Sequence, residues 1–209
     1  MKKIIKILVI ILIIAVIGAI IILKTSHDKR TVICIDAGHG GSDVGAVLDN
    51  RYEKNDTLKV AKLVKKYLSK ENVKVVMTRD EDKSVELKNR CKIANRNKAD
   101  VFVSIHRNSA ESGNGIEIWA NSGRRKDDTE LATKILNKLK NTKIQENRGI
   151  KYGTIKGENT NYYVLEHTNM PSCLIELGFI TDKKDNSLLD KNIDDYAKAI
   201  AQGILEYIN

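Results

Sequence analysis

The chain alternates between short apolar runs rich in β-branched residues and longer segments with apolar residues at helical spacing. Apolar runs of four to six residues predict strands, and apolar residues three and four apart predict helices. The predicted strands are 31–35, 73–78, 100–105, 115–120, 162–165 and 172–177, and the predicted helices are 56–68, 84–96, 127–140 and 193–207. Strands that alternate with helices are typical of α/β proteins, so we expect a single α/β domain with a largely parallel or mixed central sheet flanked by helices.

One apolar stretch at the N-terminus is too long for a strand. Residues 7–23 are all apolar or glycine, and three lysines precede them. About 20 helical residues span roughly 30 Å, the thickness of a membrane's hydrocarbon core. A secretory signal usually has a shorter apolar region followed by a small-residue cleavage site, and no such site follows this run. We expect a transmembrane helix, or an uncleaved signal, over 1–24, a short tether over 25–30 and one folded domain over 31–209.

Positive charge is in excess along the chain. Lysine and arginine number 36 against 27 acidic residues, which gives a formal net charge of +9. A basic surface is compatible with nucleic acid, anionic lipid or an acidic wall polymer as partner. However, the lysines lie in helix-like stretches, where a solvated helix face explains them. Aromatic residues make up only 5% of the chain, so we do not expect nucleic acid as a partner.

The cysteines do not indicate a disulfide framework. The chain has three of them, an odd number, and Cys34 and Cys173 lie inside predicted strands. Cys91 lies on the apolar side of a predicted helix. Thiols in apolar surroundings are usually inert, so we expect three buried free thiols rather than nucleophiles or metal ligands.

Four motifs place a histidine or a glutamate at or near the end of an apolar run. The four residues are His39, Glu53, His106 and Glu176. Two imidazoles and one carboxylate can hold zinc and leave a fourth position open for water. A further carboxylate can then move the protons of a hydrolysis. The pattern therefore indicates a metal-dependent hydrolase.

Each of these residues, taken alone, also has a simpler explanation. His39 could serve only its glycine-rich turn, and Glu53 could favour the positive end of a helix dipole. His106 could be a satisfied residue at a sheet edge. Glu176 is the most diagnostic, because a carboxylate within an apolar strand is costly unless it is paired or protonated.

Taken together and in this order, the motifs resemble the zinc-dependent N-acetylmuramoyl-L-alanine amidases of the Amidase_3 family. The resemblance covers nearly all of residues 31–209 and includes several shorter motifs. These are Met77-Thr78-Arg79, Ala94-Asn95, Ala99-Asp100 and Arg148-Gly149-Ile150-Lys151. The resemblance implies a catalytic domain that hydrolyses the amide bond between N-acetylmuramic acid and L-alanine in peptidoglycan with a zinc-activated water.

The same resemblance assigns roles to individual residues. It implies that His39, Glu53 and His106 bind one zinc ion per chain and that Glu176 is the catalytic acid and base. Candidates for contacting the substrate are Arg148, Arg107 and Asn108. The chain departs from the family pattern at Ala37, where the family often has proline. It also departs at Arg107, which replaces a small residue and is expected to put a cation at the cleft.

A catalytic domain behind one membrane anchor resembles the spore-cortex branch of the family. That branch removes peptide stems as a step towards muramic-δ-lactam, and it implies a domain on the cell-wall side or in the forespore intermembrane space. We expect peptidoglycan and the membrane as partners. Because we expect no separate wall-binding module, we also expect an extracytoplasmic activator protein. The alternatives are a vegetative cell-wall amidase, a zinc peptidase that cuts within the peptide stem, and an inactive wall-binding module.

Overall fold

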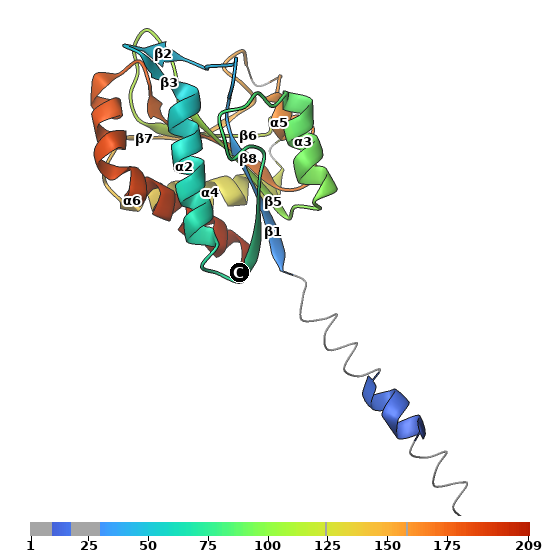
Figure 1. Ribbon diagram of the computed structural model, residues 1–209. Helices are drawn as coiled ribbons and strands as arrows, with labels where there is room; N and C mark the ends of the chain where they lie inside the picture. Colours follow the sequence, from blue (N-terminus) through green and yellow to red (C-terminus); the bar gives the residue numbers. More distant parts are fainter. Residues whose placement is uncertain (1–9, 18–29, 124, 158) are drawn as a thin grey trace, which may run out of the picture. The chain divides into compact units, whose positions relative to one another are not determined.

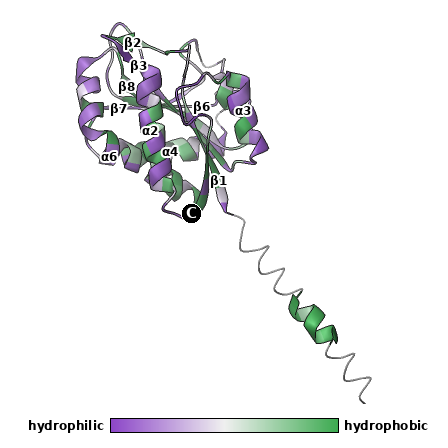
Figure 2. Cartoon of the chain, viewed as in Figure 1, coloured by the Kyte–Doolittle hydropathy of each residue, from purple (hydrophilic) through white to green (hydrophobic). Residues whose placement is uncertain are grey.

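The computed structural model describes residues 10–17, 30–123, 125–157 and 159–209. The chain divides into two units, Met1–Arg30 and Thr31–Asn209. In the first unit, residues 10–17 form a helix of exposed apolar side chains, coloured as hydrophobic in Figure 2. The rest of the predicted 1–24 segment lies outside the described residues, as does the predicted tether except for Arg30. None of the helices in the described ranges is both long enough and apolar enough to cross a membrane.

The second unit is built on one mixed sheet (Figure 1). Its strands are β1 (Thr31–Ala37), β4 (Val73–Met77), β5 (Val101–Asn108), β6 (Ile116–Ala120), β7 (Asn147–Tyr152) and β8 (Ser172–Phe179), in the order β4-β1-β5-β8-β6-β7. β6 and β8 run antiparallel, and the other neighbouring pairs run parallel. A two-residue hairpin, β2 (Val47–Leu48) and β3 (Arg51–Tyr52), stands apart. The predicted α/β domain with a mixed sheet is confirmed.

Helices cover both faces of the sheet. They are α2 (Glu53–Leu68), α3 (Leu87–Arg96), α4 (Lys126–Asn141), α5 (Tyr163–Glu166) and α6 (Lys183–Ile208). The apolar sides of α2, α4 and α6 form the larger core with one face of the sheet. The smaller helices α3 and α5 pack on the opposite face. In Figure 2, hydrophilic and hydrophobic residues alternate along the turns of α2 and α6, as expected for helices with one buried side.

The two-residue period of the strands decides which side chains reach the smaller face. Successive strand residues point to opposite faces of a sheet. In β5, Val103 and Ile105 belong to the larger core and Phe102 to the smaller one. His106 therefore shares the face of Phe102. In β8, Glu176 shares the face of Leu174 by the same rule.

The structure corrects the predicted strand over 162–165. The short helix α5 begins at Tyr163, buries Val164 and Leu165 against the smaller core, and stacks the Tyr163 ring on His167 at a centroid distance of 3.9 Å. Four residues are too few to show a helical period, and their β-type composition favoured the wrong state. In the structure α5 packs against α3 in the smaller core, a contact that the local pattern does not reveal.

Polar residues explain two further differences from the predicted elements. The last helix begins at Lys183, well before the predicted start, with Asp182 accepting a hydrogen bond from the backbone N–H of Asp185 (2.7 Å). Asn192 is non-helical inside it, and this kink interrupts the apolar pattern. Strand β7 was not predicted, because it is a polar edge strand without apolar alternation.

The three cysteines are free and buried, as predicted. Burial raises the pKa of the Cys91 thiol to about 11 and that of the Cys34 and Cys173 thiols further. These thiols are poor nucleophiles at neutral pH, because the thiolate is the reactive form.

Candidate metal centre and active site

His39 lies in the loop that follows β1, two residues beyond the strand. Its backbone is left-handed, with φ of 59°, a conformation that side chains other than glycine rarely adopt. Gly38 allows this loop to lie directly on His106, because a Cβ at Gly38 would stand 2.3 Å from Cε1 of that ring. The backbone N–H of Gly38 also donates to the carbonyl oxygen of Ile105 (3.0 Å). The glycine thus brings the two histidines together.

Glu53 is the first residue of α2 and is 4% exposed. Its Oε1 lies 2.9 Å from Nδ1 of His106, and its Oε2 lies 3.1 Å from Nε2 of His39. The backbone N–H groups of Arg107 and Ala46 donate to the same two oxygens. Burial opposes the ionisation of Glu53, but hydrogen bonds and positive charge from the two histidines outweigh it and hold the pKa of Glu53 well below its usual range.

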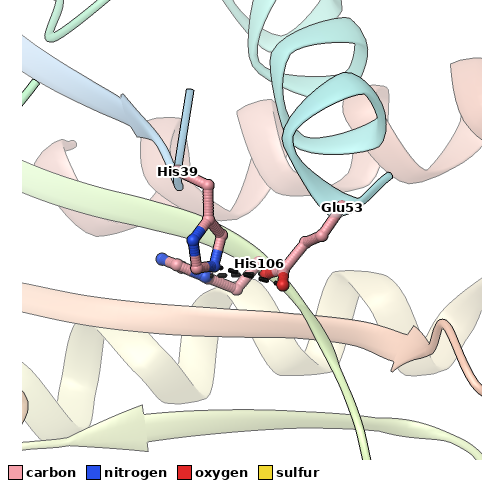
Figure 3. Close-up of side chains that lie close together, drawn as sticks. All are labelled: His39, Glu53 and His106. Carbon is pink, nitrogen blue, oxygen red and sulfur yellow. Dashed lines mark hydrogen bonds and ion pairs between the residues drawn. The ribbon is translucent and has the colours of Figure 1, made fainter. Parts of the chain in front are cut away.

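The structure brings His39, Glu53 and His106 into one group, drawn in Figure 3. One donor atom from each residue lies within 4.8 Å of the others, so a single ion can touch all three. The imidazole rings stand edge to face, with their centroids 4.9 Å apart. Two nitrogen donors and one carboxylate suit zinc, whose catalytic sites keep a fourth position open. The residues present therefore fit the expected metal.

Asp43 supports this group and was not predicted from the sequence. Its two carboxylate oxygens lie 2.9 Å from Nδ1 of His39. A hydrogen bond at Nδ1 fixes the tautomer and leaves Nε2, the atom nearest Glu53, free to bind a metal. Burial lowers the pKa of His39, but its bonds to Glu53 and Asp43 outweigh this and raise it. The spacing of four residues from His39 was visible, but spacing alone does not distinguish a supporting carboxylate from a turn residue.

Glu176 lies beside His106 in the sheet. The two residues are register partners in β8 and β5, and Glu117 of β6 is the register partner of Glu176 on the other side. The side chain of Glu176 is 8% exposed, and its Oε2 has no hydrogen-bond partner among the described residues. Burial raises the pKa of Glu176 well above its usual range, and the negative charges of Glu53 and Glu117 add to the effect. Glu176 is therefore a buried carboxyl that favours its protonated form, and it lies beside the group formed by His39, Glu53 and His106.

Glu117 is a second site residue that sequence reasoning missed. Its carboxylate accepts hydrogen bonds from Nδ2 of Asn108 (2.7 Å), Nε1 of Trp119 (3.1 Å) and Nε of Arg148 (2.8 Å). Like Glu176, it is an acid within an otherwise apolar strand, and that was the available sequence signal. Three donors satisfy Glu117, whereas Oε2 of Glu176 stays unpaired.

The candidates for contacting substrate have different surroundings. Asn108 lines the pocket beside Glu176. Arg148 is 37% exposed, stands over the Phe179 ring at 5.1 Å and is oriented by Glu117. Both stay candidates.

Arg107 also lines the pocket, but its guanidinium bonds to partners within the domain. Its side chain is 1% exposed and donates to Asp56 Oδ2 (2.7 Å), to Asn186 Oδ1 (2.7 Å) and to the carbonyl oxygen of Phe179 (3.2 Å). These partners lie in α2, α6 and β8, so the guanidinium is committed to joining these elements.

A single pocket of about 590 Å³ contains His39, Glu53, His106 and Glu176. Apolar side chains line its mouth: Leu87 is 54% exposed, Ile155 76% and Tyr163 36%. In the described part of residues 31–209, the only other large hydrophobic residue with comparable exposure is Val47, which does not line the pocket. Exposed apolar surface is thus concentrated around the candidate site, as is typical of ligand-binding clefts.

Comparison with known proteins identifies the family. Residues 33–206 match the family described as N-acetylmuramoyl-L-alanine amidase, Amidase_3. The chain belongs to this amidase family. It is 35% identical over 192 residues to the probable cell wall amidase LytH of Staphylococcus epidermidis, a match that covers 90% of this chain and 62% of that protein. The chain therefore spans about three fifths of the length of this relative.

Solved structures of amidases share the fold. The N-acetylmuramoyl-L-alanine amidase from Clostridium difficile 630 matches with a TM-score of 0.79 at 35% identity, covering 86% of this chain and 97% of that one. The CwlD amidase from Clostridioides difficile, solved in complex with the GerS lipoprotein, matches with a TM-score of 0.78 at 30% identity, covering 86% and 98%. The family resemblance drawn from the sequence motifs is confirmed.

Proposed function

We propose that this chain hydrolyses the amide bond between N-acetylmuramic acid and L-alanine in peptidoglycan. The observation that carries the proposal is a three-donor metal group in the same pocket as an unpaired, buried Glu176. Membership of the N-acetylmuramoyl-L-alanine amidase family supports this choice of scissile bond. Mass spectrometry of muropeptides tests it: incubation with the protein should release peptides that begin with L-alanine and leave muramic acid without a stem. Cuts within the stem would instead identify a peptidase.

His39, Glu53 and His106 are proposed to hold one zinc ion. Zinc supplies a Lewis acid that polarises the scissile carbonyl and acidifies water. The protein contributes the arrangement of the donors. Asp43 holds His39 in the tautomer whose Nε2 faces the group, and the backbone donors to Glu53 fix both of its oxygens.

Glu176 is proposed to carry the proton of the reaction. Without a metal ion, the raised pKa of Glu176 favours the protonated carboxyl. A cation held by His39, Glu53 and His106 would favour the carboxylate. Glu176 is therefore poised between the two states. It can accept a proton from the attacking water and return it to the departing L-alanine nitrogen, which leaves poorly as an unprotonated amine.

The pocket mouth is proposed to bind the groups around the scissile bond. The lactyl and alanyl units each carry a methyl group, and Leu87, Ile155 and Tyr163 offer apolar contacts at the rim. Arg148, with its guanidinium partly exposed, is the candidate for a stem carboxylate, and Asn108 is the candidate polar contact inside the pocket.

We also propose the spore-cortex role, with the 1–24 segment as a membrane anchor and residues 31–209 as a catalytic domain on the extracytoplasmic side. The likeness to CwlD supports the role, and its GerS complex supports a protein activator as partner. The second candidate is a vegetative cell-wall amidase, favoured by the likeness to LytH. Peptidoglycan from spores with and without the gene separates the two, because only the cortex role predicts loss of muramic-δ-lactam.

A further inference from the structure

Arg79 follows β4 and lies buried beneath the loop that carries His39. Its side chain is 1% exposed. One of its nitrogens, Nη2, donates to the carbonyl oxygens of Gly38 (2.8 Å) and Lys54 (2.8 Å). Gly38 is the neighbour of His39 in the chain, and Lys54 is the neighbour of Glu53. A single guanidinium therefore joins the backbones on which two of the proposed zinc ligands stand.

The hydrogen-bond partners of Arg79 are neutral. Its Nε donates to the carbonyl oxygen of Ala37 (2.9 Å), and its Nη1 donates to that of Glu81 (3.2 Å). Among the described residues, no carboxylate forms an ion pair with it, because the nearby Asp36 pairs with Arg90 (2.8 Å). Burial and the positive charge of Arg90 lower the pKa of Arg79. Burying a cation without a direct counter-ion is costly, so the need to fill space does not by itself explain an arginine at position 79. A guanidinium differs from an apolar side chain in offering a rigid fork of five hydrogen-bond donors.

The loop and the first turns of α2 close tightly around this fork. Gly40 has φ of 131°, and a Cβ there would lie 2.8 Å from Nε of Arg79. Thr57, one turn into α2, donates its hydroxyl to the carbonyl oxygen of Gly38 (2.8 Å) and accepts from Nη2 of Arg79 (3.1 Å). Arg79 thus contacts both ligand-bearing segments and is wrapped by each.

We propose that Arg79 is a positioning residue that sets the distance between His39 and Glu53 and so determines the affinity of the site for zinc. The inference rests on the proposed function, because it presupposes that these residues hold zinc. Arg79 touches no donor atom of the three ligands and has no part in the chemistry. Its effect belongs to metal affinity and not to turnover once the metal is bound.

The test is Arg79→Lys in the full chain, purified in detergent. Lysine keeps the charge but cannot bridge the two carbonyls in a fixed geometry. Zinc affinity, measured by competition with a chromogenic chelator, should fall about 10- to 100-fold, as is typical when a supporting contact of a metal site is lost. At saturating zinc, kcat should return close to that of the wild type.

Arg107→Lys is the matched control. Arg107 is a second buried arginine, 2% exposed, whose side chain bonds to Asp56 and Asn186 and to no residue of the His39 loop. Its contact with Glu53 runs through the backbone N–H, which the lysine variant keeps. This variant should lower the unfolding temperature and keep the zinc affinity of the wild type. The difference between the two variants separates positioning of the ligands from general stability.

Two outcomes overturn the inference. One is an Arg79→Lys protein with wild-type zinc affinity and a lowered unfolding temperature; the other is one that stays inactive at saturating zinc. If Arg79→Lys does not fold, Thr57→Val is the alternative, because it removes another hydrogen bond to the carbonyl oxygen of Gly38. Thr57→Val should weaken zinc binding by a smaller factor, and wild-type zinc affinity in Thr57→Val would contradict the proposed positioning role. A wild-type chain that binds no zinc refutes the proposed metal centre itself.

Discussion

His39 and His106 are two of the three residues proposed to hold zinc, and this role can be tested residue by residue. The wild-type chain should bind about one zinc ion, and His39→Ala or His106→Ala should each weaken binding sharply, because two donors rarely hold zinc against water. His167→Ala is the control, since that imidazole stacks on Tyr163 instead. Metal analysis after dialysis measures the effect. Unchanged zinc content in both site variants contradicts the assignment.

Glu176 is the residue on which turnover should depend. Glu176→Gln keeps the shape of the side chain but cannot carry a proton, so activity on peptidoglycan should fall about 10²- to 10⁴-fold. Zinc content and the folded structure should be retained. Glu166→Gln, at an exposed acid on α5, should leave activity as in the wild type. Near-native turnover of the Glu176 variant would show that this carboxyl is structural.

The raised pKa of Glu176 also predicts a pH dependence of stability in the metal-free protein. Above the ordinary value of 4.5 the unfolded chain releases this proton while the folded chain keeps it. The unfolded state then binds fewer protons, so Glu176 lowers stability progressively as pH rises from 4.5 towards its raised pKa. Denaturant unfolding across pH should show that Glu176→Gln gains stability over the wild type through this window and not below it. A constant difference at all pH values would contradict the shift.

At the scale of elements, the most buried strands were the easiest to predict. β1, β5 and β8 read as continuous apolar runs because both of their faces are covered, as in other parallel sheets. β7 is a polar edge strand, and α5 is too short to show a period. Their conformations are set by neighbours that a local pattern does not contain.

The residues of the candidate site also differ in how well the sequence predicts them. His39, Glu53 and His106 could be named because each lies in a motif at or near the end of an apolar run, and Glu176 because a carboxylate within an apolar strand is costly. The role of Glu117 depends on the register between β6 and β8, which pairs Glu117 with Glu176 although the two strands lie far apart in the sequence. The position of Arg107 after His106 predicts a cation at the cleft, and Arg107 does line the pocket. The sequence does not show that its guanidinium bonds to α2 and α6, next to a bulge in β5 between His106 and Asn108.

The two elements that flank the pocket predict a substrate effect. Leu87 begins α3, and Ile155 lies in the segment before α5; both expose apolar side chains at the pocket mouth. Leu87→Ser and Ile155→Ser should each raise KM up to about tenfold, with kcat and zinc content little changed. Fully burying such a side chain is worth about 1.5–3 kcal/mol, of which the substrate supplies only a part because both side chains are already partly buried, and about 1.4 kcal/mol is a factor of ten. Val47→Ser is the control, because Val47 is 45% exposed but outside the pocket. An equal KM in all three variants would remove the rim from the substrate site.

At the scale of the whole molecule, the structure bears on how an activator protein would act. The expected activator could raise either the zinc occupancy or the substrate affinity of the domain, and it would raise zinc occupancy if the glycine-rich loop over 38–45 were poorly organised alone. Instead, this loop receives hydrogen bonds from Arg79 and Arg90 and donates to Asp82 and Ser84. These contacts come from outside the loop and hold it within the domain itself, so they favour an effect of the activator on substrate binding.

The activator is therefore predicted to act on substrate binding rather than on the metal. The compact unit Thr31–Asn209 should bind zinc tightly by itself and cleave small soluble muropeptides, but release stems slowly from intact sacculi. A second extracytoplasmic protein should raise only the rate on sacculi, by adding contacts that the pocket lacks. Zinc titration of this unit, together with stem release from both substrates, makes the measurement. Weak zinc binding that the second protein restores would place its effect at the metal group, and full activity on sacculi without it would show that no activator is needed.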